Sequence, residues 1–142
     1  MNVVVDANVA IKWYLDEVHT AEAEQLVNGQ FDIHAPELLL PEFGNVLWKK
    51  CRNDELDEKV AESILGSFLT RSIILHPHST LLKAAYLGSK ETGQAVYDWT
   101  YLALAISLEC PLVTADRKFF IGLRKTRFKD RAVWVENIPN LL

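Results

Sequence analysis

The sequence has little of what marks a membrane-spanning or secreted protein. Its longest largely apolar run, residues 99–108, is ten residues long, whereas a membrane-spanning helix needs about 20. The first residues carry no basic cluster, and Asp6 interrupts their apolar run, so no signal peptide is expected. The only two cysteines, Cys51 and Cys110, form no C-x-x-C pair, which argues against a disulfide framework and a thiolate zinc site. We therefore expect a cytoplasmic protein without a membrane segment.

Glycine and proline are also scarce, with six and five residues. No linker rich in glycine, serine or proline divides the chain, and no internal repeat is present. Hydrophobic residues make up 49% of the chain and charged residues 24%, close to the averages of about 45–50% and about 25% for globular domains. This composition excludes disordered, collagen-like and coiled-coil proteins. With 142 residues, about the size of one domain, we expect a single domain over residues 1–142.

An overall excess of positive charge is lacking as well, since the net charge is −4. This total hides an uneven distribution. Residues 1–116 contain 8 Lys/Arg and 17 Asp/Glu, whereas residues 117–142 contain 7 and 2. The basic residues of the last segment are Arg117, Lys118, Arg124, Lys125, Arg127, Lys129 and Arg131. Two interpretations remain open, a solvated helix face and a patch that contacts phosphates.

Short apolar runs, most of them β-branched, predict five buried strands. They are residues 3–5, the neighbourhood of Ile33, and residues 73–75, 112–113 and 133–135. Helical patterns lie between them, at residues 9–15, 21–27, 42–52, 58–70, 81–90, 99–108 and 118–125. Short apolar strands that alternate with helices indicate a mostly parallel sheet covered on both faces. We therefore predict a three-layer α/β/α fold around a central, mostly parallel five-stranded sheet.

Acidic residues follow two of these strands, where open parallel sheets bind ligands. Asp6 follows the first strand and Asp116 the fourth, and Asp98 is expected to open the helix 99–108 at the same edge. Glu42 stands directly after Pro41 in an unusually apolar setting.

Each acid also has a structural interpretation. Asp98 and Asp116 fit helix N-caps, and Glu42 fits the first turn of a helix, where it complements the helix dipole. For Asp6 a functional role is favoured, because the end of a buried strand would desolvate its charge.

The combination of the four acids points to a cation site. Carboxylates at one edge would repel each other, by about 1 kcal/mol per pair in water at ~4 Å and about 4 kcal/mol near a protein surface. Oxygen ligands without cysteine suit Mg²⁺ or Mn²⁺ rather than zinc. The histidines, which we expect on the surface or in packing, are His19, His34, His76 and His78. An acidic pocket and a basic segment together predict phosphoryl transfer on a nucleic acid, with a water activated by the cation.

Four segments of the chain carry a resemblance to a known family. They are V-V-V-D-A-N at 3–8, P-E-F-G-N-V-L at 41–47, Y-D-W-T-Y-L-A-L-A at 97–105 and L-V-T-A-D-R-K-F at 112–119. Their order and spacing cover nearly the whole chain and resemble the PIN-domain ribonucleases. The size is similar to that of the VapC-like toxins of type II toxin–antitoxin systems.

The resemblance implies a PIN-like fold and an endoribonuclease dependent on Mg²⁺ or Mn²⁺, which leaves a 5′-phosphate and a 3′-hydroxyl. It assigns both catalysis and metal binding to four acids, Asp6, Glu42, Asp98 and Asp116. Asn8 and Thr114 fall on supporting positions, where they would orient Asp6 and Asp116. The sequence departs from the family pattern at two positions. Pro41 replaces the helix former that commonly precedes the glutamate, and Lys118 stands where some relatives carry a further acid.

The expected mechanism involves other side chains as well. Arg117 and Lys118 directly follow Asp116, so we expect them to pair with the RNA backbone beside the cleaved bond. Trp13 and Trp99 either stack on unpaired bases or belong to the core, and the core is the commoner place for an aromatic residue.

The resemblance also implies a small VapB-like antitoxin that inserts a basic side chain into the acidic pocket. We place its groove, and a homodimer contact, on surplus apolar residues around Trp13 and in the segments 38–48 and 64–69. Alternative functions are a housekeeping RNA-processing nuclease and a catalytically inactive PIN scaffold. A haloacid-dehalogenase-type phosphatase would need an aspartate at Asn8, and a receiver domain would need its aspartate after the third strand, so neither pattern is met.

Overall fold

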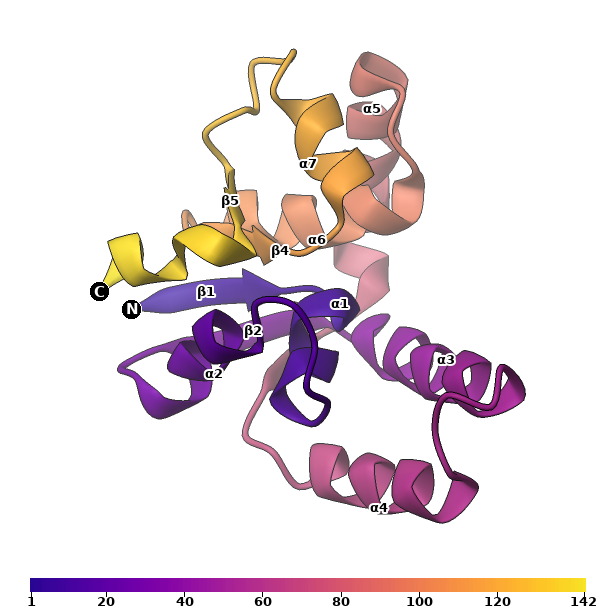
Figure 1. Ribbon diagram of the computed structural model, residues 1–142. Helices are drawn as coiled ribbons and strands as arrows, with labels where there is room; N and C mark the ends of the chain where they lie inside the picture. The colour runs from indigo at the N-terminus through magenta and orange to yellow at the C-terminus, as the bar shows by residue number, and fades with distance from the viewer.

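A wholly parallel five-stranded sheet lies at the centre of the protein, in a computed structural model that describes residues 1–142. The strands follow the order β3-β2-β1-β4-β5 across the sheet, with helices on both sides (Figure 1). The strands are β1 (Asn2–Val5), β2 (Asp32–Pro36), β3 (Ile74–His76), β4 (Leu112–Thr114) and β5 (Ala132–Trp134). The predicted three-layer α/β/α architecture is confirmed, and every strand pairing is parallel.

Ten helical segments connect or flank the strands. They are α1 (Ala7–Ala10), η1 (Ile11–Trp13), α2 (Thr20–Asn28), α3 (Leu39–Arg52), α4 (Glu58–Leu69), η2 (His78–Thr80), α5 (Leu82–Thr92), α6 (Val96–Ser107), α7 (Arg117–Leu123) and η3 (Val135–Leu141). Figure 1 shows α5, α6 and α7 gathered on one side of β1 and the pair α3 and α4 on the other. None of the helices is both long and apolar enough to cross a membrane.

Three helix predictions were wrong in detail. The helix expected over residues 42–52 begins three residues earlier, at Leu39. The helix expected over residues 9–15 is a single α-turn, α1, which continues as the 3₁₀ turn η1. The helix expected to begin at residue 99 starts at Val96, because Ala95 is still extended after Gly93 ends α5 in the left-handed region at φ 75°. Asp98 is therefore the third residue of α6 and does not cap it.

The strand at residues 73–75 was expected to be buried, but β3 begins at Ile74 and lies at the edge of the sheet. Ile74 and Leu75 are 49% and 38% exposed, because β3 has a neighbour on one side only. At the opposite edge, β5 ends one residue before Val135, which already belongs to η3. Two of the four histidines pack against each other: His34 Nδ1 lies 2.9 Å from His76 Nε2, a contact that joins β2 to β3, whereas His78 is exposed.

The core is built around the central strand β1 and the helix α6. Val3, Val4 and Val5 are fully buried, and α6 buries the whole run from Trp99 to Ala105. Helix α5 approaches α6 closely at Gly88, where a Cβ atom would lie 2.2 Å from the Trp99 ring. This packing fixes the first turn of α6 beside the carboxyl ends of β1 and β4.

Candidate active site

Asp6 begins the site, directly after β1 where the chain turns into α1. Its Oδ1 accepts the Val9 N–H at 2.9 Å and thereby caps α1. Its Oδ2 accepts the hydroxyl of Thr114, the last residue of the neighbouring strand β4. Both carboxylate oxygens of Asp6 are therefore fixed by the protein. Asn8, expected to orient Asp6, is exposed and takes no part in these two hydrogen bonds.

Thr114 connects Asp6 to Asp116. Its side chain is fully buried, and its hydroxyl oxygen accepts the Asp116 N–H at 3.0 Å while it donates to Asp6. Asp116 in turn caps α7, since its Oδ1 accepts the Phe119 N–H at 3.0 Å. One hydroxyl group thus sets the distance between two acids that come from different ends of the sequence.

Glu42 enters from the first turn of α3, one residue after Pro41. Its Oε1 accepts a hydrogen bond from the Tyr101 hydroxyl at 2.6 Å. Tyr101 lies on α6, three residues after Asp98, so both side chains fall on one face of that helix. The sequence reasoning missed Tyr101, although this spacing from Asp98 indicated its position.

The four acids line one cavity of about 200 Å³. Its lining consists of Asp6, Ala7, Asn8, Glu42, Asn45, Val46, Lys49, Asp98, Tyr101 and Asp116. Asn45 and Lys49 were not anticipated, and both lie on the face of α3 that also carries Glu42. The cavity therefore has an acidic interior with a lysine at its α3 wall.

Burial and the charges of neighbouring acids raise the pKa values of Asp6, Asp98 and Glu42. Burial raises the pKa of Asp6 from 3.8 to about 7, against the hydrogen bonds from Thr114 and Val9, and the charge of Asp116 adds to the rise. Burial, followed by the charges of Asp116 and Glu42, raises the pKa of Asp98 to about 6. The pKa of Glu42 is also raised, mainly by burial, while the Tyr101 hydrogen bond lowers it. Such a site is stabilised by any positive charge that enters it.

The donor set fits a hard divalent cation with a partly retained water shell. The four acids offer carboxylate oxygens, and the amide side chains of Asn8 and Asn45 line the same cavity. No three acidic, histidine or cysteine side chains stand close enough together to enclose one ion. A magnesium ion does not need such a cage, because it commonly binds one or two carboxylates and keeps several waters.

The remaining predicted residues separate into two groups. Arg117 and Lys118 are exposed at the start of α7, and the charge of Lys118 lowers the pKa of Asp98, which places it beside the cavity. Trp13 and Trp99 belong to the core. The Trp13 indole donates to the Ala23 carbonyl at 3.0 Å, and the Trp99 indole donates to the Thr92 hydroxyl at 2.7 Å. Stacking of these two rings on RNA bases is therefore excluded, and Trp13 is no part of an apolar groove.

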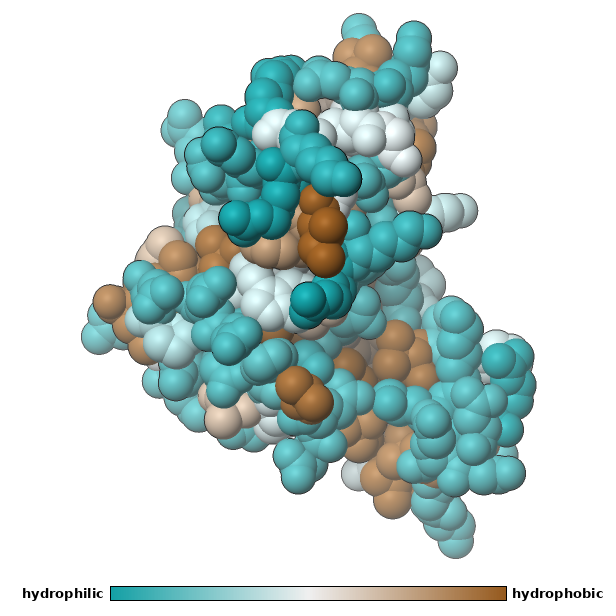
Figure 2. All heavy atoms as spheres, turned by 45° about the horizontal axis from the view of Figure 1, so that its top comes forward, coloured by the Kyte–Doolittle hydropathy of each residue, from teal (hydrophilic) through white to brown (hydrophobic).

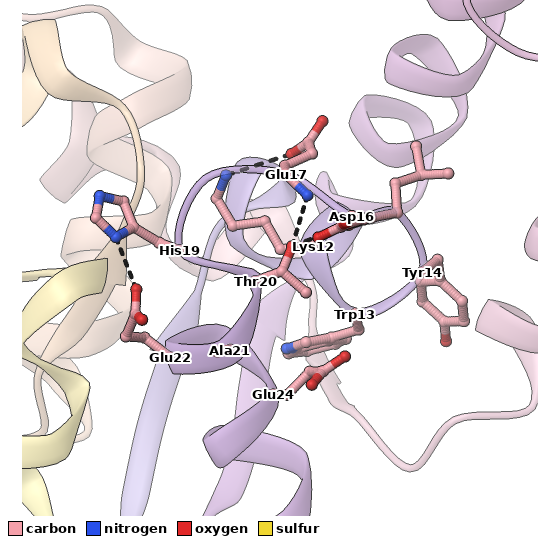
Figure 3. Close-up of a pocket in the computed structure, with 11 residues that line it drawn as sticks. Lys12, Trp13, Tyr14, Asp16, Glu17, His19, Thr20, Ala21, Glu22 and Glu24 are labelled. Carbon is pink, nitrogen blue, oxygen red and sulfur yellow. Dashed lines mark hydrogen bonds and ion pairs between the residues drawn. The ribbon is translucent and has the colours of Figure 1, made fainter.

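A larger hollow of about 510 Å³ lies around the loop between η1 and α2 (Figure 3). Four side chains of its lining have partners of the complementary kind. Glu17 contacts Lys12 at 3.3 Å and Lys50 at 3.0 Å, and His19 lies 2.7 Å from Glu22. None of the four predicted acids lines this hollow, so we locate the chemistry in the smaller cavity.

Comparison with known proteins identifies the family. The sequence profile described as "PIN domain" matches residues 3–122. Ribonuclease VapC3 of Pyrobaculum aerophilum is 32% identical over 120 residues, which cover 83% of this chain and 92% of the relative. The VapC ribonuclease Mb0985 of Mycobacterium bovis is 28% identical over 114 residues, 80% of this chain and 85% of the relative.

Solved structures show the same fold. PAE2754 from Pyrobaculum aerophilum superposes with a TM-score of 0.73 and 26% identity, covering 99% of this chain and 89% of that one. VapC20 of Mycobacterium tuberculosis superposes with a TM-score of 0.62 and 13% identity, covering 80% and 87%. The chain belongs to the PIN-domain family and is one of its VapC-type ribonucleases.

Proposed function

We propose that the cavity cleaves RNA internally with a hydrated Mg²⁺ or Mn²⁺ that would be bound among Asp6, Asp98 and Asp116, by one or two of these carboxylates directly and by the rest through its waters, with Glu42 completing the site. The observation that carries the proposal is the convergence of four carboxylates from four separate segments on one cavity. The pKa values of Asp6, Asp98 and Glu42 are raised, first by burial and then by neighbouring carboxylates, so a cation that enters the site would be stabilised there. When bound there, such a cation supplies a readily ionised water and stabilises charge on the departing oxygen.

The protein's own groups position this chemistry. Thr114 holds the Asp6 carboxylate and the start of α7 in a fixed relation. Tyr101 holds one oxygen of Glu42 and leaves the other for the cation or for one of its waters. Arg117 and Lys118, exposed beside Asp116, pair with the RNA phosphates next to the cleaved bond.

Cleavage of a structured RNA with and without EDTA tests the metal and the acids. We expect activity with Mg²⁺ or Mn²⁺ that EDTA abolishes, and loss of activity in Asp6→Asn, Asp98→Asn and Asp116→Asn. Glu55→Gln, which changes an exposed acid in the loop between α3 and α4, is the matched control. Cleavage that survives EDTA, or that persists in the three variants, would contradict the proposed site.

We also propose that the chain is a cytoplasmic toxin held inactive by a small VapB-like antitoxin. Support comes from its structural neighbours. VapC20 is described as a sarcin–ricin loop cleaving toxin, and other neighbours are a toxin–antitoxin complex from Klebsiella pneumoniae and the FitAB complex bound to DNA. A basic side chain of the antitoxin, placed among the four acids, would take the place of the cation and form charge-assisted hydrogen bonds.

An apolar groove between α3 and α4 is the surface we assign to this partner. It is about 380 Å³ in volume and is lined by Gly44, Leu47, Trp48, Cys51, Glu58, Ala61, Glu62 and Leu65. Figure 2 shows brown, apolar atoms gathered at the lower right, where α3 and α4 lie. Trp48 is 55% exposed and Leu69, at the end of α4, is 64% exposed. Such an apolar patch fits an antitoxin segment that folds on binding. We propose a homodimer contact on the same surface when no antitoxin is bound.

Co-expression with the small protein encoded next to this gene tests the toxin role. We expect a stable, inactive complex and relief of growth inhibition. Trp48→Glu should weaken the complex without altering RNA cleavage, and sedimentation of the isolated chain tests the homodimer. A chain that cuts RNA but is harmless on overexpression, and with which no small neighbour co-purifies, would favour the housekeeping nuclease instead.

A further inference from the structure

The charge segregation seen in the sequence forms an exposed surface in the fold. All seven basic residues after β4 are exposed. Arg127 is paired with Glu91 of α5 through two hydrogen bonds, of 2.7 and 3.0 Å. No ion pair joins any of the other six to an acid. Six unneutralised cations therefore lie on α7 and in the loop after it, in a chain that is otherwise strongly acidic.

Helix α7 arranges four of these residues as two pairs. It buries Phe119 and Leu123 against the core, so its opposite side faces solvent. Arg117 and Lys118 stand at its start, and Arg124 and Lys125 stand seven residues further on, just past its end. Seven residues correspond to about 10 Å along a helix. The basic side of α7 thus extends outward from the cavity, which Asp116 lines immediately before the helix begins.

The outer pair of cations is held on a well-anchored element. The Arg124 guanidinium lies over the Phe120 ring, 5.6 Å from its centroid. The side chain of Gln94 occupies the space that a Cβ atom would need at Gly122, 2.1 Å from that position, so α7 is docked tightly on the turn between α5 and α6. In Figure 1 the loop after α7 lies at the top of the molecule, beyond the end of α7 that is farther from β4.

We propose that this α7 surface, with Arg124 and Lys125 as its outer anchor, binds the RNA backbone on one side of the cleaved bond. The proposal rests on the proposed function of the cavity and extends it to the path of the substrate. RNA is the partner favoured by the observations, because the two basic pairs begin at the cavity and continue away from it, as a chain of phosphates would. The contacts are charge pairs with phosphates, which bind any base sequence.

Binding of a fluorescein-labelled oligouridylate in EDTA, measured by anisotropy over a range of salt concentrations, tests the proposal without any cleavage. Loss of two phosphate contacts in Arg124→Gln/Lys125→Gln should weaken binding on the order of ten-fold near physiological salt and reduce the slope of log K against log salt by about 1.4. In cleavage assays with Mn²⁺ the KM should rise by a similar factor while kcat is unchanged, because the two residues do not touch the reacting atoms.

The matched control is Lys59→Gln/Lys83→Gln, which removes the same charge from exposed positions on α4 and α5. An equal loss of binding in the control would show a net-charge effect and overturn the proposal. Unchanged RNA binding in Arg124→Gln/Lys125→Gln would also overturn it. The same holds if this variant binds RNA normally and loses only its binding of the antitoxin or of duplex DNA, measured in parallel. Since the binding assay contains no metal, a normal result there with failed metal-dependent cleavage would count against the proposed cavity and leave the α7 surface standing.

Discussion

At the scale of single residues, the Asp6 carboxyl links stability to pH. With a pKa of about 7 in the folded protein against 3.8 for an ordinary aspartate, Asp6 binds more protons in the folded than in the unfolded state between about pH 4 and pH 7. The free energy of unfolding of the metal-free protein should therefore fall as pH rises through this window. The loss reflects the cost of ionising a buried carboxyl group beside Asp116.

Asp6→Asn should remove much of this pH dependence and raise the metal-free Tm at pH 7.5, on the order of 5 °C. Asparagine still caps α1, and the Thr114 hydroxyl, which donates and accepts, can turn to meet the amide. Thermal unfolding in EDTA at pH 5 and pH 7.5 measures both effects. A variant that unfolds at a lower temperature than the wild type at pH 7.5 would show that hydrogen bonding of the carboxylate outweighs its desolvation.

Thr114 offers a second test at this scale, because its hydroxyl serves two partners. Thr114→Val keeps the shape of the side chain but leaves the Asp116 N–H without its acceptor and Asp6 without its donor. We expect a loss of about 1–3 kcal/mol in the free energy of unfolding, together with weaker RNA cleavage. Thr114→Ser retains the hydroxyl and should recover most of the activity. Urea unfolding at pH 7.5 and initial cleavage rates distinguish the two variants, and equal behaviour would contradict the bridging role.

At the scale of elements, replacement by alanine should have opposite effects on stability at two helical glycines. A Cβ atom at Gly88 of α5 would lie 2.2 Å from the Trp99 ring, whereas nothing lies within 4 Å of a Cβ atom at Gly66 of α4. Gly88→Ala should destabilise the protein by about 1–3 kcal/mol through overpacking and should also lower activity, since Trp99 adjoins Asp98 in α6. Gly66→Ala should stabilise α4 by about 0.5–1 kcal/mol. Chemical denaturation checks both, and similar effects of the two changes would refute the close packing of α5 on α6.

The elements also show what the sequence could predict. The five strands were found because short apolar runs between helices are distinctive, and the sheet placed Asp6 and Asp116 at one edge. Helix starts were less accurate, since Ala95 ends its extended segment without any capping side chain. The exposure of β3 could not be predicted, because strand order depends on the packing of the whole chain.

The residues of the site also divide into those that local sequence patterns indicate and those that they do not. Its acids follow strands or open helices, so local patterns indicate them. Asn45 and Lys49 reach the cavity only through the placement of α3 beside α1, which no local pattern fixes, whereas the spacing of Tyr101 from Asp98 did indicate its position. Asn8 is the opposite case, since it stands at the expected position but leaves the orientation of Asp6 to Val9 and Thr114.

For the whole molecule, a bound cation should act as a stabilising ligand. The proposed Mn²⁺ site exists only in the folded protein, so the Tm should rise with the logarithm of the Mn²⁺ concentration. Asp98→Asn should raise the metal-free Tm, because it removes a charge that is disfavoured first by burial and then by repulsion from Asp116 and Glu42, and it should reduce the further rise caused by Mn²⁺. Differential scanning fluorimetry at pH 7.5 measures both, with Glu55→Gln as the control. A wild-type Tm that does not respond to Mn²⁺ would contradict the proposed cation.

The bond between Thr114 and Asp6 spans 108 positions of the chain, and it determines when in its synthesis the protein becomes a nuclease. The ribosome releases β1 first, but β1 gains its β4 neighbour, and the cavity its fourth carboxylate, Asp116, only after residues 112–116 have emerged. On the proposed function, the cavity therefore cannot assemble during most of elongation, and a product truncated before Thr114 should be inactive. The order of strands in the sheet thus gives the translating ribosome a delay before the enzyme that it is making can cut RNA.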